Sequence, residues 1–416
     1  MSRRSPIIVV TGANGGVGFG ICHRLLIQLC QPCPSDAKPA PALGNKDVED
    51  GIEPCESLTL IMACRSVKRG EAARAQLFRL LDEHLAKVQQ SPEDIAYAKR
   101  FRKNVRIDLH YSDLASVSTI LRLGAELRQK YPYISHIICN AGLASFIGID
   151  WALAIRRVLT NLVDAVTNPD YNLQNWGERS IDGLGWVWQC NVFGHYCLFR
   201  ELEPALQKSP ERPRVLWMSS LEGRPGYYEA EDWQLLKTQH SYQASKYQMD
   251  LIATILDRRV LKGSHGSNTP RHLIIHPAVT HTNVSHALAS GITDFLKVIS
   301  FYLARFLGSP NHPIHPYKAA ISAVHVSLVA LAFLPTALSF STAGVKGNTM
   351  PKGPTPIKIG SETDWWGQER VGVAPVLEWD EHEKEAGELV KKCEALYTSL
   401  REAEGELSFE QATEHM

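Results

Sequence analysis

Tyr242 and Lys246 bracket the segment Tyr-Gln-Ala-Ser-Lys, and this spacing of four residues places both side chains on one face of a helix. A free tyrosine titrates at about pH 10 and is a poor acid–base group at neutral pH. A lysine ammonium group beside it favours the phenolate, so we expect a lowered pKa for the Tyr242 phenol. The chain has thirteen tyrosines, so such a pair can arise by chance, and its place in the fold must decide its meaning.

Two serines precede this pair at the end of a predicted strand. Ser219 and Ser220 follow the apolar run 214–218, and the carboxyl ends of strands in open α/β sheets face the ligand crevice. Either hydroxyl could hydrogen-bond a carbonyl oxygen that Tyr242 protonates. These residues predict acid catalysis on a carbonyl substrate.

Two asparagines lie at related places in the pattern. Asn140-Ala141-Gly142 follows the predicted strand 136–139, where a backbone beside a cofactor needs small residues. Asn191 lies inside the next predicted helix, 189–206. An inward-facing amide there is either a buried, hydrogen-bonded residue or the holder of a proton-relay water.

A glycine-rich turn, Thr11-Gly12-Ala13-Asn14-Gly15-Gly16-Val17-Gly18, follows the first predicted strand, 7–10, and opens a helix over 18–29. Glycines permit the tight turn and the close approach of backbone to a pyrophosphate, and the helix N-terminus attracts the phosphates. A triphosphate loop would end in Gly-Lys-Ser/Thr, which this turn does not contain, so a dinucleotide is favoured.

Arg65 follows the second predicted strand, 58–63. An NAD site would place an acidic residue here to accept hydrogen bonds from the ribose 2′-hydroxyl. An arginine instead suits the 2′-phosphate of NADP through charge-assisted hydrogen bonds. The predicted cofactor is therefore NADPH.

Strands and helices alternate along most of the chain. Further strands are predicted at 105–108 and 272–276, with helices at 68–85, 116–130 and 242–261. This alternation predicts an α/β fold with a doubly wound parallel sheet, the Rossmann fold. We expect one domain over 1–345 with insertions at about 31–57, interpreted as a solvated loop, and 151–185. A C-terminal extension, 346–416, contains an acid-rich helix over 378–414, which is typical of a solvated tail.

Composition narrows the class of protein. The 416 residues contain 44 Lys and Arg against 44 Asp and Glu, so no charge excess points to nucleic acid. Nine scattered cysteines suit a reducing compartment, and the N-terminus has no secretory pattern.

We expect no metal site, because Cys30-x2-Cys33 has no second ligand pair. His195 and His281 lie near the predicted site and are expected to be structural.

With these motifs in order, the chain resembles the short-chain dehydrogenase/reductase superfamily over about residues 7–345. The resemblance implies that Tyr242 is the acid, Lys246 tunes it and binds the nicotinamide ribose, Ser220 holds the carbonyl, and Asn191 serves the proton relay. Asp108 matches the adenine-contacting aspartate, and Ala278 stands where the family has glycine. The implied cofactor contacts are Thr11, Gly12, Asn14, Gly16, Val17, Gly18, Arg65, Asp108, Leu109, Asn140, Ala141, Gly142, Tyr242, Lys246, Pro277, Val279 and Thr282.

Within the superfamily, the detail is similar to fungal 3-ketosteroid reductases of sterol C-4 demethylation. The supporting segments are 188–194, 231–233, 242–247 and 365–367. This implies NADPH-dependent reduction of a 3-keto sterol at the cytoplasmic face of the endoplasmic reticulum, beside a methyl oxidase, a decarboxylase and a scaffold. A reductase of another lipid ketone or alcohol, such as a retinoid, and a dinucleotide-binding scaffold without catalysis are the alternatives.

Two apolar stretches bear on membrane contact. Residues 287–307 carry few charges, and apolar packing on a sterol or shallow insertion into a bilayer would both explain them. Residues 319–341 are uncharged and long enough for a span, although the resemblance implies a helix packed on the sheet. We expect peripheral attachment to the membrane.

Overall fold

The computed structural model describes residues 5–44, 54–55, 57–87, 91–263, 268–282, 292–335, 337–338 and 354–414. Within these residues, eight strands form the path β11-β10-β8-β7-β4-β1-β2-β3 of one sheet, and β9 pairs with β10. The strands are β1 (Ile7–Thr11), β2 (Thr59–Cys64), β3 (Arg106–Tyr111), β4 (His136–Cys139), β7 (Arg214–Met218), β8 (Arg271–His276), β9 (Ala337–Leu338), β10 (Thr355–Thr363) and β11 (Glu369–Pro375).

The predicted doubly wound parallel sheet is confirmed. From β3 to β10 the neighbouring strands of the path run parallel, and within the described part of this sheet only β11 and the short β9 pair antiparallel. Strand β1 lies at the centre, where Val9 pairs with Ile61 of β2 and Ile137 of β4. Strands buried on both faces are continuous apolar runs, which is why their positions could be predicted.

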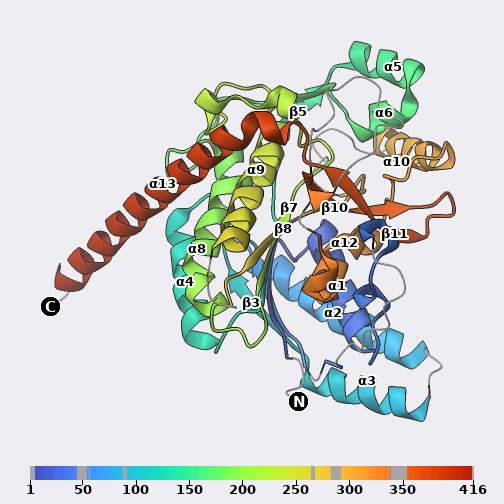
Figure 1. Cartoon of the computed structure of the whole chain (residues 1–416), viewed down its shortest axis with the longest axis vertical. Coiled ribbons are helices and arrows are strands. Elements are labelled where there is room, and N and C mark those ends of the chain that lie inside the picture. The colour runs from blue at the N-terminus through green and yellow to red at the C-terminus, as the bar shows by residue number, and fades with distance from the viewer. Residues whose placement is uncertain are drawn as a thin grey trace.

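Helices cover both faces of the sheet (Figure 1). One face packs against α1 (Gly16–Leu29), α2 (Val67–Lys87) and α12 (Ile321–Leu328). The other packs against α4 (Val117–Lys130), α8 (Gly194–Leu206) and α9 (Ser241–Lys262). The remaining helices are α3 (Pro92–Asn104), α5 (Trp151–Thr160), α6 (Leu162–Thr167), α7 (Trp186–Trp188), α10 (Ile292–Phe306), α11 (Pro316–Ala319) and α13 (Trp379–Glu414).

The first insertion differs from the solvated loop that its composition predicts. Of its described residues, 31–44, 54–55 and 57, the first stretch contains short 3₁₀ turns whose residues Asp36, Ala37 and Leu43 are buried. Residues 45–53 and 56 of the predicted insertion lie outside the described residues. The interpretation as a loop missed the buried segment because its anchoring is polar and comes from distant elements.

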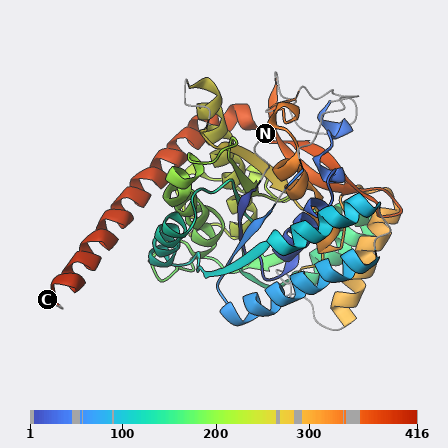
Figure 2. The same ribbon diagram turned by 90° about the horizontal axis from the view of Figure 1, so that it is seen from below.

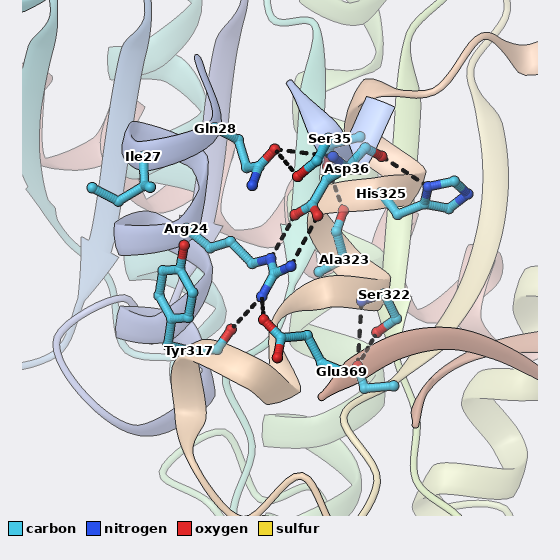
Figure 3. A network of polar contacts seen from close by, with 12 residues as sticks. Arg24, Ile27, Gln28, Ser35, Asp36, Tyr317, Ser322, Ala323, His325 and Glu369 are labelled. Atoms are coloured by element: carbon cyan, nitrogen blue, oxygen red, sulfur yellow. Dashed lines mark hydrogen bonds and ion pairs between the residues drawn. The ribbon is translucent and has the colours of Figure 1, made fainter. Parts of the chain in front are cut away.

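Arg24 of α1 provides that anchoring (Figure 3). Its guanidinium group donates to both carboxylate oxygens of Asp36, at 2.5 and 2.9 Å, and to Glu369 of β11 at 2.7 Å. The carbonyl of Asp36 in turn lies 2.8 Å from Nδ1 of His325 in α12. One buried cation therefore joins a helix, the insertion and the edge of the sheet.

The second insertion, 151–185, forms a small cap above the sheet. It contains α5, α6 and β6 (Asn172–Gln174), which pairs antiparallel with β5 (Phe146–Ile149). Helix α6 packs on α10, with Val166 against Phe301 and Ala304 in one apolar cluster. Figure 1 shows these elements grouped at one end of the molecule, beyond the carboxyl ends of the strands.

The C-terminal part contributes more to the fold than the sequence indicates. Strands β10 and β11 extend the sheet past the expected boundary at residue 345. The first half of α13 is not a solvated tail, because its apolar side chains are buried in the core beside α9; these are Trp379, Ala386, Leu389, Val390, Cys393 and Tyr397. The rest of α13 projects away from the body (Figure 2).

The uncharged stretch 319–341 is not a span in its described part. Helix α12 is eight residues long and fully buried against the sheet, while 336 and 339–341 lie outside the described residues. None of the helices over the described ranges is both long and apolar enough to cross a bilayer.

We predict that Arg24→Met lowers the free energy of unfolding by about 3–5 kcal/mol, because it leaves Asp36 and Glu369 as buried carboxylates without their cation. Urea denaturation measures the change. Arg102→Met is the control, since Arg102 pairs with Asp82 at the surface and its loss should cost about 0–1 kcal/mol. Equal losses in the two variants would contradict the role of the Arg24 network.

Candidate functional site

A cavity of about 1010 Å³ opens at the carboxyl ends of the central strands. Ligand pockets usually measure about 300–1,000 Å³, so this one has room for a dinucleotide and a substrate. Among the predicted site residues, the cavity is lined by Thr11, Gly12, Asn14, Gly16, Val17, Arg65, Asn140, Ala141, Gly142, Ser220, Tyr242, Lys246, Pro277, Val279 and Thr282. Most of the predicted site is therefore brought together.

The glycine turn has the geometry that a pyrophosphate cradle requires. Gly12 and Gly16 have φ of +65° and +51°, which disfavours any residue with a side chain. A Cβ at Gly18 would lie 2.4 Å from the carbonyl oxygen of Gly12, so Gly18 sits behind the cavity and permits close packing. Gly15 at the N-cap provides no side-chain cap, which leaves first-turn amides of α1 available to a phosphate.

Thr11 joins the ends of β1 and β4. Its hydroxyl accepts the backbone N–H groups of Asn140 and Ala141, both at 2.9 Å, and its carbonyl accepts the Asn140 amide at 2.9 Å. The same hydroxyl lies 3.0 Å from Nε2 of buried His195. The segment 140–142 therefore packs closely on Thr11 and Gly12, which explains its small residues 141 and 142 independently of a cofactor.

The base-binding end of the cavity departs from the expected residues. Arg65 lines it together with Ser66 and Arg69. Asp108 does not, because its carboxylate points away to Tyr131, at 2.6 Å, and Arg106.

Asp113 lies where the strand β3 has ended, and it lines the cavity in place of Asp108. Leu109 also misses the cavity, since it packs on Gly70 of α2. The sequence contains two Asp-Leu pairs, 108–109 and 113–114, and β3 runs three residues beyond the predicted end at 108. The second pair is therefore the one that reaches the site.

Ser220, Tyr242 and Lys246 converge on the cavity floor. The Ser220 hydroxyl hydrogen-bonds the Tyr242 phenol, whereas the Ser219 hydroxyl points to the carbonyl of Lys246 at 3.4 Å. Both serines line the cavity, and Ser220 is the one whose hydroxyl lies beside the Tyr242 phenol. The Lys246 ammonium group donates to the carbonyl of Met218 at 2.8 Å and lies 5.8 Å from the centre of the Tyr242 ring.

The pKa of Tyr242 moves opposite to the expected direction. Burial, and then the nearby Glu222, raise the pKa of the phenol, while the Ser220 hydrogen bond lowers it to a smaller extent. Burial lowers the pKa of Lys246 to about 8, against the opposing effect of Asp250. At neutral pH the site therefore presents a protonated phenol beside an ammonium group, which is the state that can give a proton to a carbonyl oxygen.

Glu222 is a site residue that the sequence analysis missed. It lines the cavity, accepts a hydrogen bond from Gln243 at 3.0 Å, and burial raises its pKa to about 7. Its position two residues after Ser220 was the available signal, but a glutamate in a polar turn usually faces solvent.

Asn191 lies in one π-helical turn, Gln189–Phe193, between α7 and α8. Its side chain is fully buried and does not line the cavity: it accepts from the backbone of Leu143 at 2.8 Å and donates to Leu143 and Ser245, both at 2.9 Å. The amide is thus hydrogen-bonded by the chain, the first of the two alternatives left open by the sequence.

The segment 277–282 faces the glycine turn from the opposite wall. Ala278 has a φ of +55°, the left-handed conformation for which glycine is favoured. Carbons of the Thr282 side chain would lie 3.5 and 3.6 Å from a Cβ at Gly16, so the two walls approach closely. Ala278 therefore adopts the left-handed conformation at the position where a glycine was expected.

The upper wall is apolar and comes from the cap and from α10. Trp151, Ala154 and Val158 of α5 face Leu296 and Phe301 of α10 across the cavity. Helix α10 therefore lies over the cavity and contributes apolar side chains to it. Of the apolar stretch 287–307, residues 287–291 lie outside the described residues. A hydrophobic ligand therefore fits above the polar floor.

No protein-family model matches the chain. Among solved structures, salutaridine reductase from Papaver somniferum is 16% identical with a TM-score of 0.47, covering 78% of this chain and 95% of that one. The RhlG/NADP complex of Pseudomonas aeruginosa is 14% identical with a TM-score of 0.45, covering 77% and 89%.

Curated fungal proteins are more similar in sequence. The 3-keto-steroid reductase of Saccharomyces cerevisiae is 33% identical over 335 residues, covering 79% of this chain and 82% of the yeast protein. That of Kluyveromyces lactis is 30% identical over 329 residues, covering 78% and 81%. That of Aspergillus fumigatus is 29% identical over 415 residues, covering 90% and 85%. With its serine, tyrosine and lysine gathered beside a glycine turn, the chain belongs to the family of the 3-keto-steroid reductases.

Proposed function

We propose that the protein reduces a 3-keto sterol of C-4 demethylation to the 3-hydroxy sterol, with NADPH as its cofactor. The observation that carries this proposal is the convergence of Ser220, Tyr242 and Lys246 on the floor of a cavity between a glycine turn and an apolar wall. NADPH supplies the hydride when bound. The names of the fungal relatives support a 3-keto steroid as the substrate.

The chain's own groups divide the remaining work. Ser220 holds the substrate carbonyl oxygen by a hydrogen bond, and the Tyr242 phenol gives that oxygen its proton. The Lys246 ammonium group stabilises the phenolate that remains, because opposite charges favour each other in a buried site. The apolar wall of α5 and α10 excludes water and receives the sterol rings.

Tyr242→Phe removes the proton donor and should lower kcat with a 4-methyl 3-keto sterol by about 10²–10⁴-fold, the usual contribution of a general acid. NADPH oxidation measures turnover, and fluorescence titration of NADPH checks that the cofactor site survives. The control is Tyr171→Phe, because Tyr171 also lines the cavity but its hydroxyl donates to the backbone of Ala165.

Near-wild-type turnover by Tyr242→Phe would overturn the mechanism. If the wild-type protein instead prefers retinal or another steroid ketone in a substrate panel, the sterol assignment fails while the chemistry stands. Bound NADPH without turnover of any ketone would indicate the non-catalytic scaffold.

Arg65 and Arg69 should determine the preference for NADPH over NADH. Each contributes an exposed guanidinium group to the base-binding end of the cavity, and a charge-assisted hydrogen bond contributes about 1.5–3 kcal/mol. Arg65→Ala and Arg69→Ala should each raise KM for NADPH about 10- to 100-fold and leave KM for NADH nearly unchanged. Lys68→Ala is the control, since Lys68 is a neighbouring cation outside the lining; an equal effect there would contradict the assignment.

We further propose that the protein attaches peripherally to the cytoplasmic face of the endoplasmic reticulum, beside the methyl oxidase, decarboxylase and scaffold of the same sequence of reactions. Exposed apolar side chains support membrane contact. They gather on α5, α10 and the turn between β10 and β11, and include Trp151, Ile155, Leu159, Phe295, Leu303, Phe306, Trp365 and Trp366.

These elements adjoin one another at the mouth of the cavity. Helix α6 links α5 to α10, and the β10–β11 turn lies against Arg305 of α10 at Gly367. Figure 1 shows all of them on the same side of the molecule. Tryptophan side chains favour the membrane–water interface, and Trp366 is 91% exposed. A sterol could then pass between the bilayer and the cavity without crossing water.

Trp365→Ser/Trp366→Ser should weaken binding to phosphatidylcholine/phosphatidylserine vesicles at least about tenfold, or about 1.4 kcal/mol, as measured by co-sedimentation. Turnover of a detergent-dispersed sterol should stay unchanged. The matched control is Ile95→Ser/Leu261→Ser, which removes exposed apolar side chains from α3 and α9 instead. Equal binding by both variants would refute this membrane surface.

A further inference from the structure

A buried lysine from the C-terminal strand β10 lies directly behind the catalytic serine. The Lys358 side chain is 5% exposed, and its ammonium group lies 2.6 Å from the carboxylate of Asp250, which is fully buried. It also donates to the carbonyls of Ser220, at 3.3 Å, and Gly223, at 3.0 Å. Two of the three ammonium donors therefore serve backbone carbonyls, and the Asp250 carboxylate lies at ion-pair distance.

The two carbonyls belong to one turn. The N–H of Gly223 donates to the carbonyl of Ser220 at 3.3 Å, which closes the turn Ser220–Gly223. Within it, the N–H of Glu222 donates to the Ser220 hydroxyl at 3.2 Å. Because that hydroxyl oxygen accepts from the backbone, the turn holds the Ser220 hydroxyl beside Tyr242. The shape of the turn thus sets the position of the Ser220 hydroxyl.

The turn also lies tightly on the helix that carries the acid. A Cβ at Gly223 would come within 3.2 Å of the Asp250 carboxylate and 3.1 Å of the Lys246 backbone. Asp250 follows Lys246 by four residues, so it lies one turn further along the same face of α9. The pair Lys358–Asp250 therefore connects the serine turn to the tyrosine–lysine helix.

We propose that Lys358 and Asp250 are positioning residues for the reduction: Lys358 fixes the Ser220–Gly223 turn on α9, and Asp250 is its counter-ion and that of Lys246. The proposal rests on the proposed function. Burial excludes a surface role, and the ammonium group contacts the carbonyls at both ends of the Ser220–Gly223 turn. The active site is then completed by a residue outside the range of the superfamily resemblance.

Asp250 acts on Lys246 electrostatically as well. Several titratable groups surround Lys246, and they come from every element packed against it. They are Tyr242 and Asp250 on α9, Glu222 on the turn, Cys139 on β4 and His195 on α8. Lys358 on β10 lies on the far side of Asp250. Among them the Asp250 carboxylate raises the pKa of Lys246 most. Loss of this carboxylate lowers that pKa further, so Lys246 gives up its proton at a lower pH.

The test compares two buried ion pairs that each join a strand to α9. Lys358→Met/Asp250→Asn removes the charges behind the serine turn. Arg271→Met/Asp257→Asn is the matched control, because that pair is also buried, joins β8 to α9 at 2.7 Å, and Asp257 bonds Arg271 and the backbone of His272 instead of the serine turn. Both variants are assayed with NADPH and a 4-methyl 3-keto sterol, together with melting temperature.

We expect the Lys358/Asp250 variant to lose at least about tenfold in kcat with KM for NADPH within about twofold, while the control keeps kcat despite a similar loss of stability. Asp250→Asn alone should move the alkaline limb of the kcat profile to lower pH. Gly223→Ala, which displaces the turn and keeps both charges, should lower kcat as well and covers the case in which the double variant does not fold.

Wild-type kcat in the Lys358/Asp250 variant, an equal loss in the control, or an alkaline limb that stays in place in Asp250→Asn would each overturn the proposal. These outcomes differ from failure of the proposed function, in which the wild-type protein itself would not reduce the sterol ketone.

Discussion

The hydroxyl of Thr11 joins the cofactor side of the site to its catalytic side. Nδ1 of His195 lies 3.0 Å from the carbonyl of Asn191, which can only accept, so Nδ1 carries the proton and Nε2 must accept. Burial lowers the pKa of His195 to about 4 and keeps it neutral. Thr11 therefore donates to His195 and still accepts two backbone N–H groups from 140 and 141. The glycine turn, the β4 end and the π-helical turn are held in one arrangement.

Burial then decides the protonation states within that arrangement. Burial keeps the Tyr242 phenol protonated and lowers the pKa of Lys246 to about 8, and a protonated phenol is the form that can give a proton to a carbonyl oxygen. The spacing of Tyr242 and Lys246 in the sequence predicted that the two side chains lie near each other, which they do. It also predicted a lowered pKa for the phenol, whereas the pKa is raised. Spacing shows which charges are near, whereas the dominant effect here is desolvation, which depends on everything packed around the pair.

The central strands, the glycine turn and the serine–tyrosine–lysine set could be predicted because each rests on local sequence. Apolar runs reveal strands buried on both faces, and glycines reveal the turn. Strand β10 could not be predicted in this way, since Pro356, Lys358 and Gly360 interrupt its apolar pattern. Each interruption has a distant cause: Lys358 meets Asp250, and Gly360 gives space to the ring of His276. Asp113 was missed because the end of β3 depends on its pairing with β2.

The packing of the C-terminal part on α9 also has a consequence for the order of folding. The core beside α9 includes Trp379 and Tyr397, and the serine turn receives its ammonium group from residue 358. During synthesis on the ribosome, the Rossmann core can begin to assemble early, since β1 to β4 precede the C-terminal part in the chain. The catalytic centre must wait until almost the entire polypeptide has emerged, so a nascent chain would bind its dinucleotide before it could turn over a ketone.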